Sequence, residues 1–351
     1  MAEDTGSAPP RVTIRDVALA ANVHVSTVSR ALDPSKRSLI AEATRERVVA
    51  AAKELGYQPH LVASGLRRGQ TLTVGIVVPD LGNPIYAPLA RGATHALEGA
   101  NYMPLLADTQ DDHERLARFL RHLAERRVEA IIATAARLDD AQLLVEIAQR
   151  GIPVVTAVRT VSSTGLPAVL HDDTAGGRLA AEHLLDLGHE RVAQVRGSLE
   201  VEPFVRRTEA FTAAVTAAGA TLTDGVPPVP HLTADEGRSA ALALLDVDPA
   251  RRPTGVFVQN DVMALGALMA VRDLGLRCPE DVSIVGYNDA FFAAHTDPPL
   301  TTVRLDAYQV GHAAGVLALE LIADPGQEHR GSSVPPELVV RRSTAPPGSG
   351  A

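Results

Sequence analysis

The stretch TIRDVALAANVHVSTVSRAL, residues 13–32, decides the fold of the first part of this 351-residue chain. Thr13 and Asp16 form a capping-box pattern, which typically starts a helix. Little more than Asn22 separates two groups of apolar residues, so two short helices must meet at a sharp angle. The stretch therefore predicts a helix-turn-helix whose second helix fits a DNA major groove. The apolar residues recur at helical spacing in both groups: Ile14, Val17, Ala18 and Ala21, then Val25, Val28 and Leu32.

The local charge favours this interpretation over an ordinary three-helix bundle that happens to expose an arginine. Residues 11–70 carry ten Lys or Arg against five Asp or Glu, whereas the whole chain has a net charge of −9. A basic segment on an acidic body is expected when one part of a protein binds a polyanion and the rest does not. We therefore expect the N-terminal segment to bind DNA.

The composition indicates the cellular setting. With 46% hydrophobic residues, the chain can form globular domains, and its length suits two or three of them. The single cysteine, Cys278, cannot form an intramolecular disulfide. The sequence shows no signal-peptide pattern and no apolar run of the length that spans a membrane. We expect a cytoplasmic protein with no membrane contact, and disordered tails at residues 1–10 and 345–351.

The body of the chain alternates short apolar runs with amphipathic stretches such as residues 86–98. This alternation is typical of parallel sheets that are covered by helices on both faces. The body is too long for one such sheet of ordinary size, so we expect two doubly wound lobes with a ligand cleft beyond the strand ends. The predicted strands are residues 73–78, 128–133, 153–158, 192–195, 255–258 and 282–285.

Several motifs carry a resemblance to a known family. In the headpiece they are TIRDVA (13–18), TVSR (27–30), TRERV (44–48) and GYQP (56–59). In the body they follow in order: NPIY (83–86), the DD and GG pairs (172–177), LGH (187–189), RTEAF (207–211), QNDVMA (259–264), VGYND (285–289) and PPLTTV (298–303). Over roughly residues 12–343 the chain strongly resembles the LacI/GalR-type transcriptional repressors. The resemblance implies an all-α helix-turn-helix headpiece and an α/β core of two doubly wound lobes, similar to periplasmic binding proteins.

The resemblance also implies domain boundaries and partners. A homodimer would bind a palindromic operator in double-stranded DNA, and a small-molecule effector in the cleft would control the affinity. We expect the DNA-binding domain at 11–59, a hinge helix or linker at 60–70, the first lobe at 71–169 and 302–333, and the second lobe at 170–301 and 334–344.

Side-chain chemistry and the resemblance together predict the DNA contacts. Arg30 can bond a guanine through two N–H groups, Val25 can touch a thymine methyl, and Ser26 lies at a specificity position. Leu66 matches an apolar residue that wedges into the minor groove. In the same segment this chain has His60 where the family often has asparagine. His24 and Ala41 replace better N-cap residues, so a softer headpiece is expected. The predicted contacts are Thr13, Thr27 and Ser29 to phosphate, Val25, Ser26 and Arg30 to bases, Leu66 in the minor groove, and Tyr57.

The effector site is carried over from the resemblance. Arg207 matches an arginine that clamps effector oxygens, although an inter-lobe salt bridge is an alternative. Asn260 matches an asparagine that bonds sugar hydroxyls, while Asp261 is expected to cap the helix that follows. The full predicted set is Ile85, Tyr86, Arg207, Leu232, Asn260, Asn288, Asp289 and Leu305.

This pocket departs from that of sugar-responsive relatives. They commonly carry aspartates at the positions of Val158 and Asn288, and some have an aromatic residue at Leu232 and a polar one at Leu305. The resemblance therefore predicts a sugar or sugar derivative, and the departures favour an effector with an anionic or less polar part, such as a phosphorylated or oxidised sugar.

Other function classes fit less well. An uptake protein would need a secretion signal and no headpiece. An enzyme would need a nucleophile with a base, or a metal cluster, and the histidines are scattered. Asp108, Asp111 and Asp112 with His113 could suggest a metal, but a solvated loop is the better interpretation. We expect no enzyme activity, no cofactor and no metal, and the open alternative is a repressor controlled by a protein partner or a non-sugar ligand.

Overall fold

The computed structural model describes residues 12–32, 36, 39–57, 71–223, 225–326 and 331–348. The chain forms two compact units, residues 1–71 and 72–351. The predicted hinge residues 60–70, with His60 and Leu66, lie outside the described residues, as do residues 1–10.

The first unit confirms the helix-turn-helix. The helices are α1 (Ile14–Ala20), α2 (Val25–Ala31) and α3 (Glu42–Glu54). Asn22 adopts a left-handed backbone (φ 49°) in the turn between α1 and α2, which lets the chain reverse within a few residues. Val17, Val28 and Val48, one from each helix, are fully buried together. The apolar stripes of the sequence thus form a single small core.

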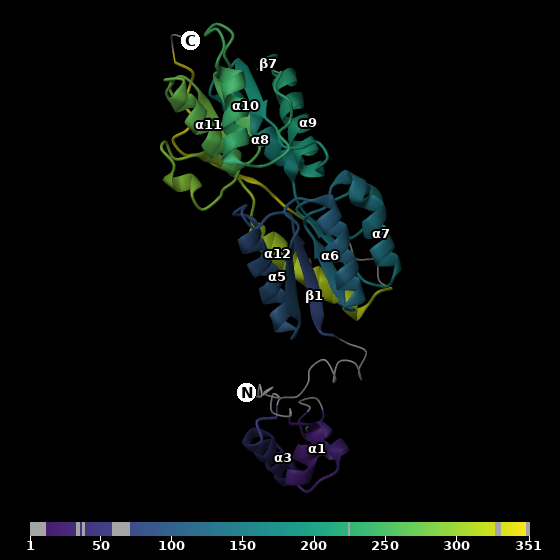
Figure 1. Ribbon diagram of the computed structural model, residues 1–351. Helices are drawn as coiled ribbons and strands as arrows, with labels where there is room; N and C mark the ends of the chain where they lie inside the picture. Colours follow the sequence, from purple (N-terminus) through teal and green to yellow (C-terminus); the bar gives the residue numbers. More distant parts are fainter. Residues whose placement is uncertain are drawn as a thin grey trace, which may run out of the picture. The chain divides into compact units, whose positions relative to one another are not determined.

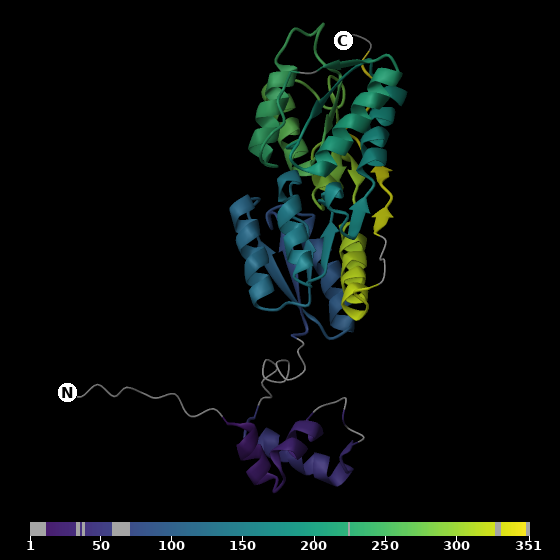
Figure 2. The same ribbon diagram turned by 90° about the vertical axis from the view of Figure 1, so that its right-hand side faces the viewer.

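The second unit confirms the two doubly wound lobes (Figures 1 and 2). The sheet of the first lobe has the order β11-β5-β4-β3-β1-β2, and that of the second has the order β12-β10-β9-β8-β6-β7. Neighbouring strands are parallel except β10 and β12. The first-lobe strands are β1 (Thr73–Val78), β2 (Met103–Asp108), β3 (Ala130–Ala133), β4 (Val154–Ala157), β5 (Ala168–His171) and β11 (Ser332–Val334). The second-lobe strands are β6 (Arg191–Val195), β7 (Thr221–Thr223), β8 (Gly255–Val258), β9 (Ser283–Asn288), β10 (Thr301–Arg304) and β12 (Glu337–Val339).

Helices cover both faces of each sheet, and the burial of the strands follows from this. In β1, Ile76 packs toward one helix layer and the adjacent Val77 toward the other. A strand covered on both sides has no solvated face, so its sequence reads as a continuous apolar run. The first-lobe helices are α5 (Tyr86–Gly99), α6 (His113–Glu125), α7 (Ala141–Gln149) and α12 (Ala307–Ala323). The second-lobe helices are α8 (Asp173–Asp186), α9 (Glu202–Ala217), α10 (Ala234–Leu245) and α11 (Asp261–Asp273).

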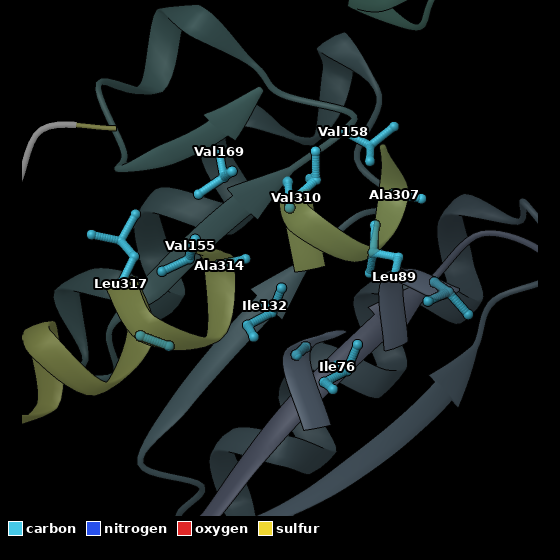
Figure 3. Close-up of a cluster of buried hydrophobic side chains, with 14 of the residues drawn as sticks. Ile76, Leu89, Ile132, Val155, Val158, Val169, Ala307, Val310, Ala314 and Leu317 are labelled. Carbon is cyan, nitrogen blue, oxygen red and sulfur yellow. The ribbon is translucent and has the colours of Figure 1, made fainter. Parts of the chain in front are cut away.

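The core of the first lobe joins segments that are far apart in sequence. Figure 3 shows Ile76 and Ile132 of the sheet near Val310 of α12 and Leu89 of α5. The helices α5 and α12 approach each other so closely that a Cβ on Gly311 would lie 2.0 Å from the backbone oxygen of Leu89. Glycine at this position therefore allows the C-terminal helix to close the first lobe.

Several predicted domain boundaries are wrong. Leu170 and His171 belong to β5 of the first lobe, and Ala345, predicted to begin a disordered tail, hydrogen-bonds to Ser283. The largest error is at residue 302. The segment from residue 302 was assigned to the first lobe, but Thr302 pairs with Gly286 of β9, and Val303 is buried in the second-lobe core. The chain returns to the first lobe only after Arg304, where Asp306 caps α12 by accepting the Gln309 N–H at 3.1 Å. The crossover motif at 298–303 is thus itself largely a second-lobe strand. Among the described residues, no helix has the length and apolar character needed to span a membrane.

Candidate functional site

The second helix of the headpiece has one polar face open to solvent. Ser26 and Arg30 are exposed and lie four residues apart on α2, so they project from the same side. Val28 and Ala31 are buried in the core of the three helices. A hydroxyl and a guanidinium on one helix face are donors of the kind that read base edges in the major groove.

His24 caps α2, so the expectation that it is a poor N-cap is wrong. Its Nδ1 accepts the Ser26 backbone N–H at 3.2 Å and lies 2.8 Å from the Ser26 hydroxyl oxygen. The ring nitrogen takes the place of the side-chain oxygen that a serine or asparagine would offer. If the Ser26 hydroxyl donates its hydrogen to His24, a DNA contact in which it donates has to replace that bond, whereas its oxygen can still accept from a base. Ala41, at the start of α3, offers no side-chain cap, as expected.

The other predicted DNA contacts are either bonded within the headpiece or only partly exposed. The Thr13 hydroxyl donates to the Asp16 carboxylate at 2.7 Å, and the same carboxylate accepts the Thr13 N–H at 2.7 Å. A phosphate contact by Thr13 would have to break the first of these bonds. Val25 and Tyr57 pack against the headpiece core and expose only part of their surface. Thr27 and Ser29 are half-buried on α2.

Residues of both lobes line a narrow cavity of about 20 Å³. Six of the eight predicted effector residues lie in its wall: Ile85, Tyr86, Arg207, Leu232, Asn260 and Asn288. Six more wall residues were not in the predicted set: Asn83, Val158, Arg159, Val201, Pro203 and Phe204. A cavity of this size holds one or two water molecules.

Asp289 and Leu305 do not line this cavity, which corrects their assignment. The Asp289 carboxylate accepts from Arg304 at 2.9 Å and from Arg341 at 2.6 Å, so both of its oxygens are used inside the second lobe. Leu305 is buried in the first-lobe core instead. Both residues directly follow a strand, as several wall residues do. Asp289 has a left-handed backbone (φ 55°) and turns away from the cavity, and Leu305 lies in the crossover from β10 to the first lobe.

Arg207 lies on α9, and the contacts of its guanidinium are with residues of the same lobe. Its Nε donates to Asp173 at 2.7 Å, one Nη donates to the Gln259 carbonyl at 2.9 Å, and its guanidinium lies 3.6 Å from the centre of the Tyr287 ring. Burial opposes the charged form, but Asp173 and Tyr287 together outweigh it and raise the pKa of Arg207. Because Asp173 begins α8, also in the second lobe, the ion pair of Arg207 lies within one lobe, and the alternative of an inter-lobe salt bridge is wrong.

Arg159 is a second buried guanidinium in the cavity wall, and it comes from the first lobe. It forms an ion pair with Asp111, and the side chain of Arg159 is 5% exposed. Tyr86, also buried, lines the same cavity wall. The residue before Arg159, Val158, has a left-handed backbone (φ 61°), which is rare for a β-branched side chain. The only sequence signal for Arg159 was its place directly after a predicted strand.

The asparagines of the cavity wall have distinct roles. Asn260, not Asp261, is the N-cap of α11, because its side-chain oxygen accepts the Val262 N–H at 2.7 Å. Asp261 is buried and accepts the Ala290 N–H and the Thr302 hydroxyl, both at 2.7 Å. Burial raises the pKa of Asp261 to about 7. Asn288 is 5% exposed, and among the described residues no group donates a hydrogen bond to its side-chain oxygen.

The acidic residues near residue 110 serve the fold of the first lobe. Asp112 caps α6 by accepting the Arg115 N–H at 2.7 Å. Asp111 pairs with Arg159, and Arg137 lies 3.7 Å from its carboxylate. Asp112 and His113 are exposed, as expected of a solvated loop, whereas the Asp111 side chain is 17% exposed.

Comparison with known proteins agrees with this geometry. Residues 13–60 match the family model of bacterial regulatory proteins of the lacI family, and residues 181–344 match that of the periplasmic binding protein-like domain. The HTH-type transcriptional repressor PurR of Aliivibrio fischeri (strain MJ11) is 33% identical over 335 residues, which cover 94% of this chain and 98% of PurR. The chain belongs to the lacI family of bacterial regulatory proteins.

Solved structures of lacI-family regulators extend the comparison. The transcriptional regulator CelR in complex with cellobiose is 31% identical, with a TM-score of 0.70, and the match covers 95% of this chain and all of CelR. The lac repressor dimer bound to operator and the anti-inducer ONPF is 26% identical, with a TM-score of 0.84, and covers 96% of this chain and 100% of its own. This lacI-family member is therefore a DNA-binding transcriptional regulator with a periplasmic-binding-protein-like core.

Proposed function

We propose that this protein is a repressor that binds a palindromic operator as a homodimer and that a small molecule in the inter-lobe cavity controls its affinity for DNA. The observation that carries the proposal is the cavity, because both lobes supply polar side chains to it while α2 presents Ser26 and Arg30 to solvent. CelR with cellobiose and the lac repressor with operator and ONPF are relatives whose structures hold such partners.

The size of the cavity supports a mechanism for the control. A sugar-sized ligand cannot enter about 20 Å³ without moving the lobes apart or rearranging the wall. A ligand that binds one arrangement of the lobes better than another shifts the equilibrium between them. We infer that the effector re-angles the lobes and thereby changes the placement of the two headpieces in the dimer.

The nearly filled cavity also favours a second candidate, a repressor controlled by a protein partner. The two candidates differ in one respect. A small molecule must contact the cavity wall, whereas a protein partner can act on the outside of either lobe. A wall substitution that abolishes the response would support the first candidate.

The test of DNA recognition is selection of binding sites from a random DNA pool with the full chain. Binding to the selected site is then measured for the wild type, for Arg30→Ala and for the control Arg178→Ala, which removes the same charge from the exposed surface of α8. If Arg30 contacts a base, its loss should weaken specific binding by about 1–3 kcal/mol, with a smaller effect on random DNA. Equal behaviour of the two variants, or a selection that yields no palindromic site, would contradict the proposal.

A further inference from the structure

The hydrogen-bonding character of the cavity wall indicates the chemical class of the effector. The inference rests on the proposed function, because it concerns the ligand of the same site. Two wall asparagines have their side-chain oxygens occupied locally: Asn260 accepts the Val262 N–H at 2.7 Å, and Asn83 accepts the Ile85 N–H at 3.4 Å. Because a backbone N–H needs an acceptor, these bonds fix which end of each amide faces it. The amide NH₂ groups, which only donate, are left for a ligand.

The two charged residues of the wall are also donors. Arg159 and Arg207 come from different lobes, and each pairs with a carboxylate, Asp111 and Asp173 respectively. A guanidinium has five N–H groups and no acceptor. The bonds from Arg207 to Asp173 and Gln259 use two of these groups, so a ligand can take up others.

Acceptors are scarce in the same wall. The cavity residues that the structure describes include no Asp or Glu. The side-chain oxygen of Asn288 is a buried acceptor that lacks a donor among the described residues. The Tyr86 hydroxyl is buried in the same wall as Arg159, whose guanidinium can only donate. The charged side chains of the wall are thus all donors, and Asn288 holds the acceptor that has no donor among the described residues.

This imbalance disfavours a neutral polyol. Each hydroxyl of a sugar carries a hydrogen that must find an acceptor when it is buried, and an unmet polar group costs about 1–3 kcal/mol. A carboxylate or phosphate group only accepts, so it can satisfy several donors without needing an acceptor of its own. Phe204 and Leu232 supply apolar surface beside these polar groups.

We propose that the effector is a hydroxylated anion whose acidic group lies between Arg159 and Arg207 and whose hydroxyl donates to the Asn288 oxygen. Carboxylate and phosphate share the required acceptor chemistry, and both are available on acidic sugar derivatives. The acid group would join the two lobes, since its two arginines come from opposite sides of the cavity.

The experiment uses the full chain and matched pairs of compounds. Isothermal titration calorimetry compares each acid with its neutral parent sugar. The carboxylate pairs are gluconate with glucose and galactonate with galactose, and the phosphate pairs are glucose 6-phosphate with glucose and ribose 5-phosphate with ribose. We expect at least one acid to bind at least tenfold more tightly than its neutral partner. The carboxylate and phosphate pairs show which acid group the site accepts. A neutral sugar that binds as tightly as its acid, or a panel in which no acid binds at millimolar concentration, would overturn the proposal.

The variant Asn288→Asp provides a second test. It replaces the open acceptor by a negative charge of the same size, at a backbone conformation (φ 116°) that asparagine already adopts. We expect it to weaken binding of the acid at least tenfold, whereas Glu182→Gln, on the surface of α8, should leave binding unchanged. Unchanged affinity in Asn288→Asp, with a circular dichroism spectrum like that of the wild type, would refute the anion site. The effect of Arg30→Ala on operator binding does not depend on the ligand, so this inference can fail while the proposed function stands.

Discussion

The buried ion pair between Asp173 and Arg207 makes Asp173→Asn a decisive test of how the second lobe is held together. The two side chains are 5% and 4% exposed, and Nε donates to the carboxylate at 2.7 Å. The same carboxylate oxygen accepts the Tyr287 hydroxyl at 3.1 Å. The substitution keeps the shape and one acceptor but leaves a buried guanidinium without its counter-charge.

The expected cost follows from burial. Removing one partner of a buried ion pair typically destabilises a protein by about 3–5 kcal/mol, because the other charge stays buried without compensation. Here the Gln259 carbonyl and the face of the Tyr287 ring still contact Arg207, so the lower end, about 3 kcal/mol, applies. The control Glu182→Gln breaks a pair with Arg178 whose side chains are 44% and 54% exposed. Such a surface pair is worth about 1 kcal/mol or less.

The assay is urea unfolding of the full chain at pH 7, followed by far-UV circular dichroism. Burial alone would raise the pKa of Asp173, but Arg207 and His171 together outweigh it and lower the pKa below the ordinary value of 3.8. The stability from this pair is therefore fully present above about pH 4 and is lost as the pH falls through the lowered pKa. The difference in the free energy of unfolding between the wild type and Asp173→Asn should therefore become smaller only below about pH 4. A cost no larger than that of Glu182→Gln would refute the reasoning.

Three further changes test other parts of the molecule. His24→Ala should lower headpiece stability by about 1 kcal/mol in thermal unfolding because the cap is lost, whereas His24→Ser should keep it; an equal loss in both would argue against the cap. Gly177→Ala would place a Cβ 2.5 Å from the backbone oxygen of Arg207 and should cost about 1–3 kcal/mol in urea unfolding, while Gly99→Ala, which meets nothing within 4 Å, should change stability little. Burial raises the pKa of Asp261 from 3.8 to about 7, so the wild type should lose stability as pH rises across that range and Asp261→Asn should remove the loss; parallel pH profiles would contradict this.

The sequence predicted the elements that depend on local patterns. The apolar stripes of residues 13–32 were sufficient for α1 and α2, and continuous apolar runs identified strands such as β1 and β8. The family resemblance supplied the predicted cleft residues Ile85 and Asn260, which lie in the cavity wall. Each of these features is fixed within a few residues of the chain.

The missed features depend on contacts between distant residues. Arg159 lies in the wall because Asp111, 48 residues earlier, pairs with it, and no local pattern reveals that partner. Asp289 was placed in the pocket because it follows Asn288, but its partner Arg341 is 52 residues away. His24 was predicted to be a poorer N-cap because caps usually carry a side-chain oxygen, whereas its ring nitrogen accepts the Ser26 N–H. Sequence patterns give the positions of side chains along an element but not the partners that other segments bring to them.

Two residues of the cavity wall, Val158 and Asn288, have a left-handed backbone. Val158 follows β4 with φ 61°, a conformation that typically costs a non-glycine residue about 1–3 kcal/mol. Around it the Val158 N–H donates to the Val169 carbonyl at 3.2 Å, and the Arg159 N–H donates to the Ala157 carbonyl at 2.7 Å. This tight turn brings the Arg159 guanidinium against Asp111 in the cavity wall. Asn288, at φ 116°, also has a left-handed backbone in this wall and holds the open acceptor. The unusual backbone at the ends of β4 and β9 therefore positions two polar groups in the cavity wall: the Arg159 guanidinium, which donates, and the Asn288 oxygen, which accepts.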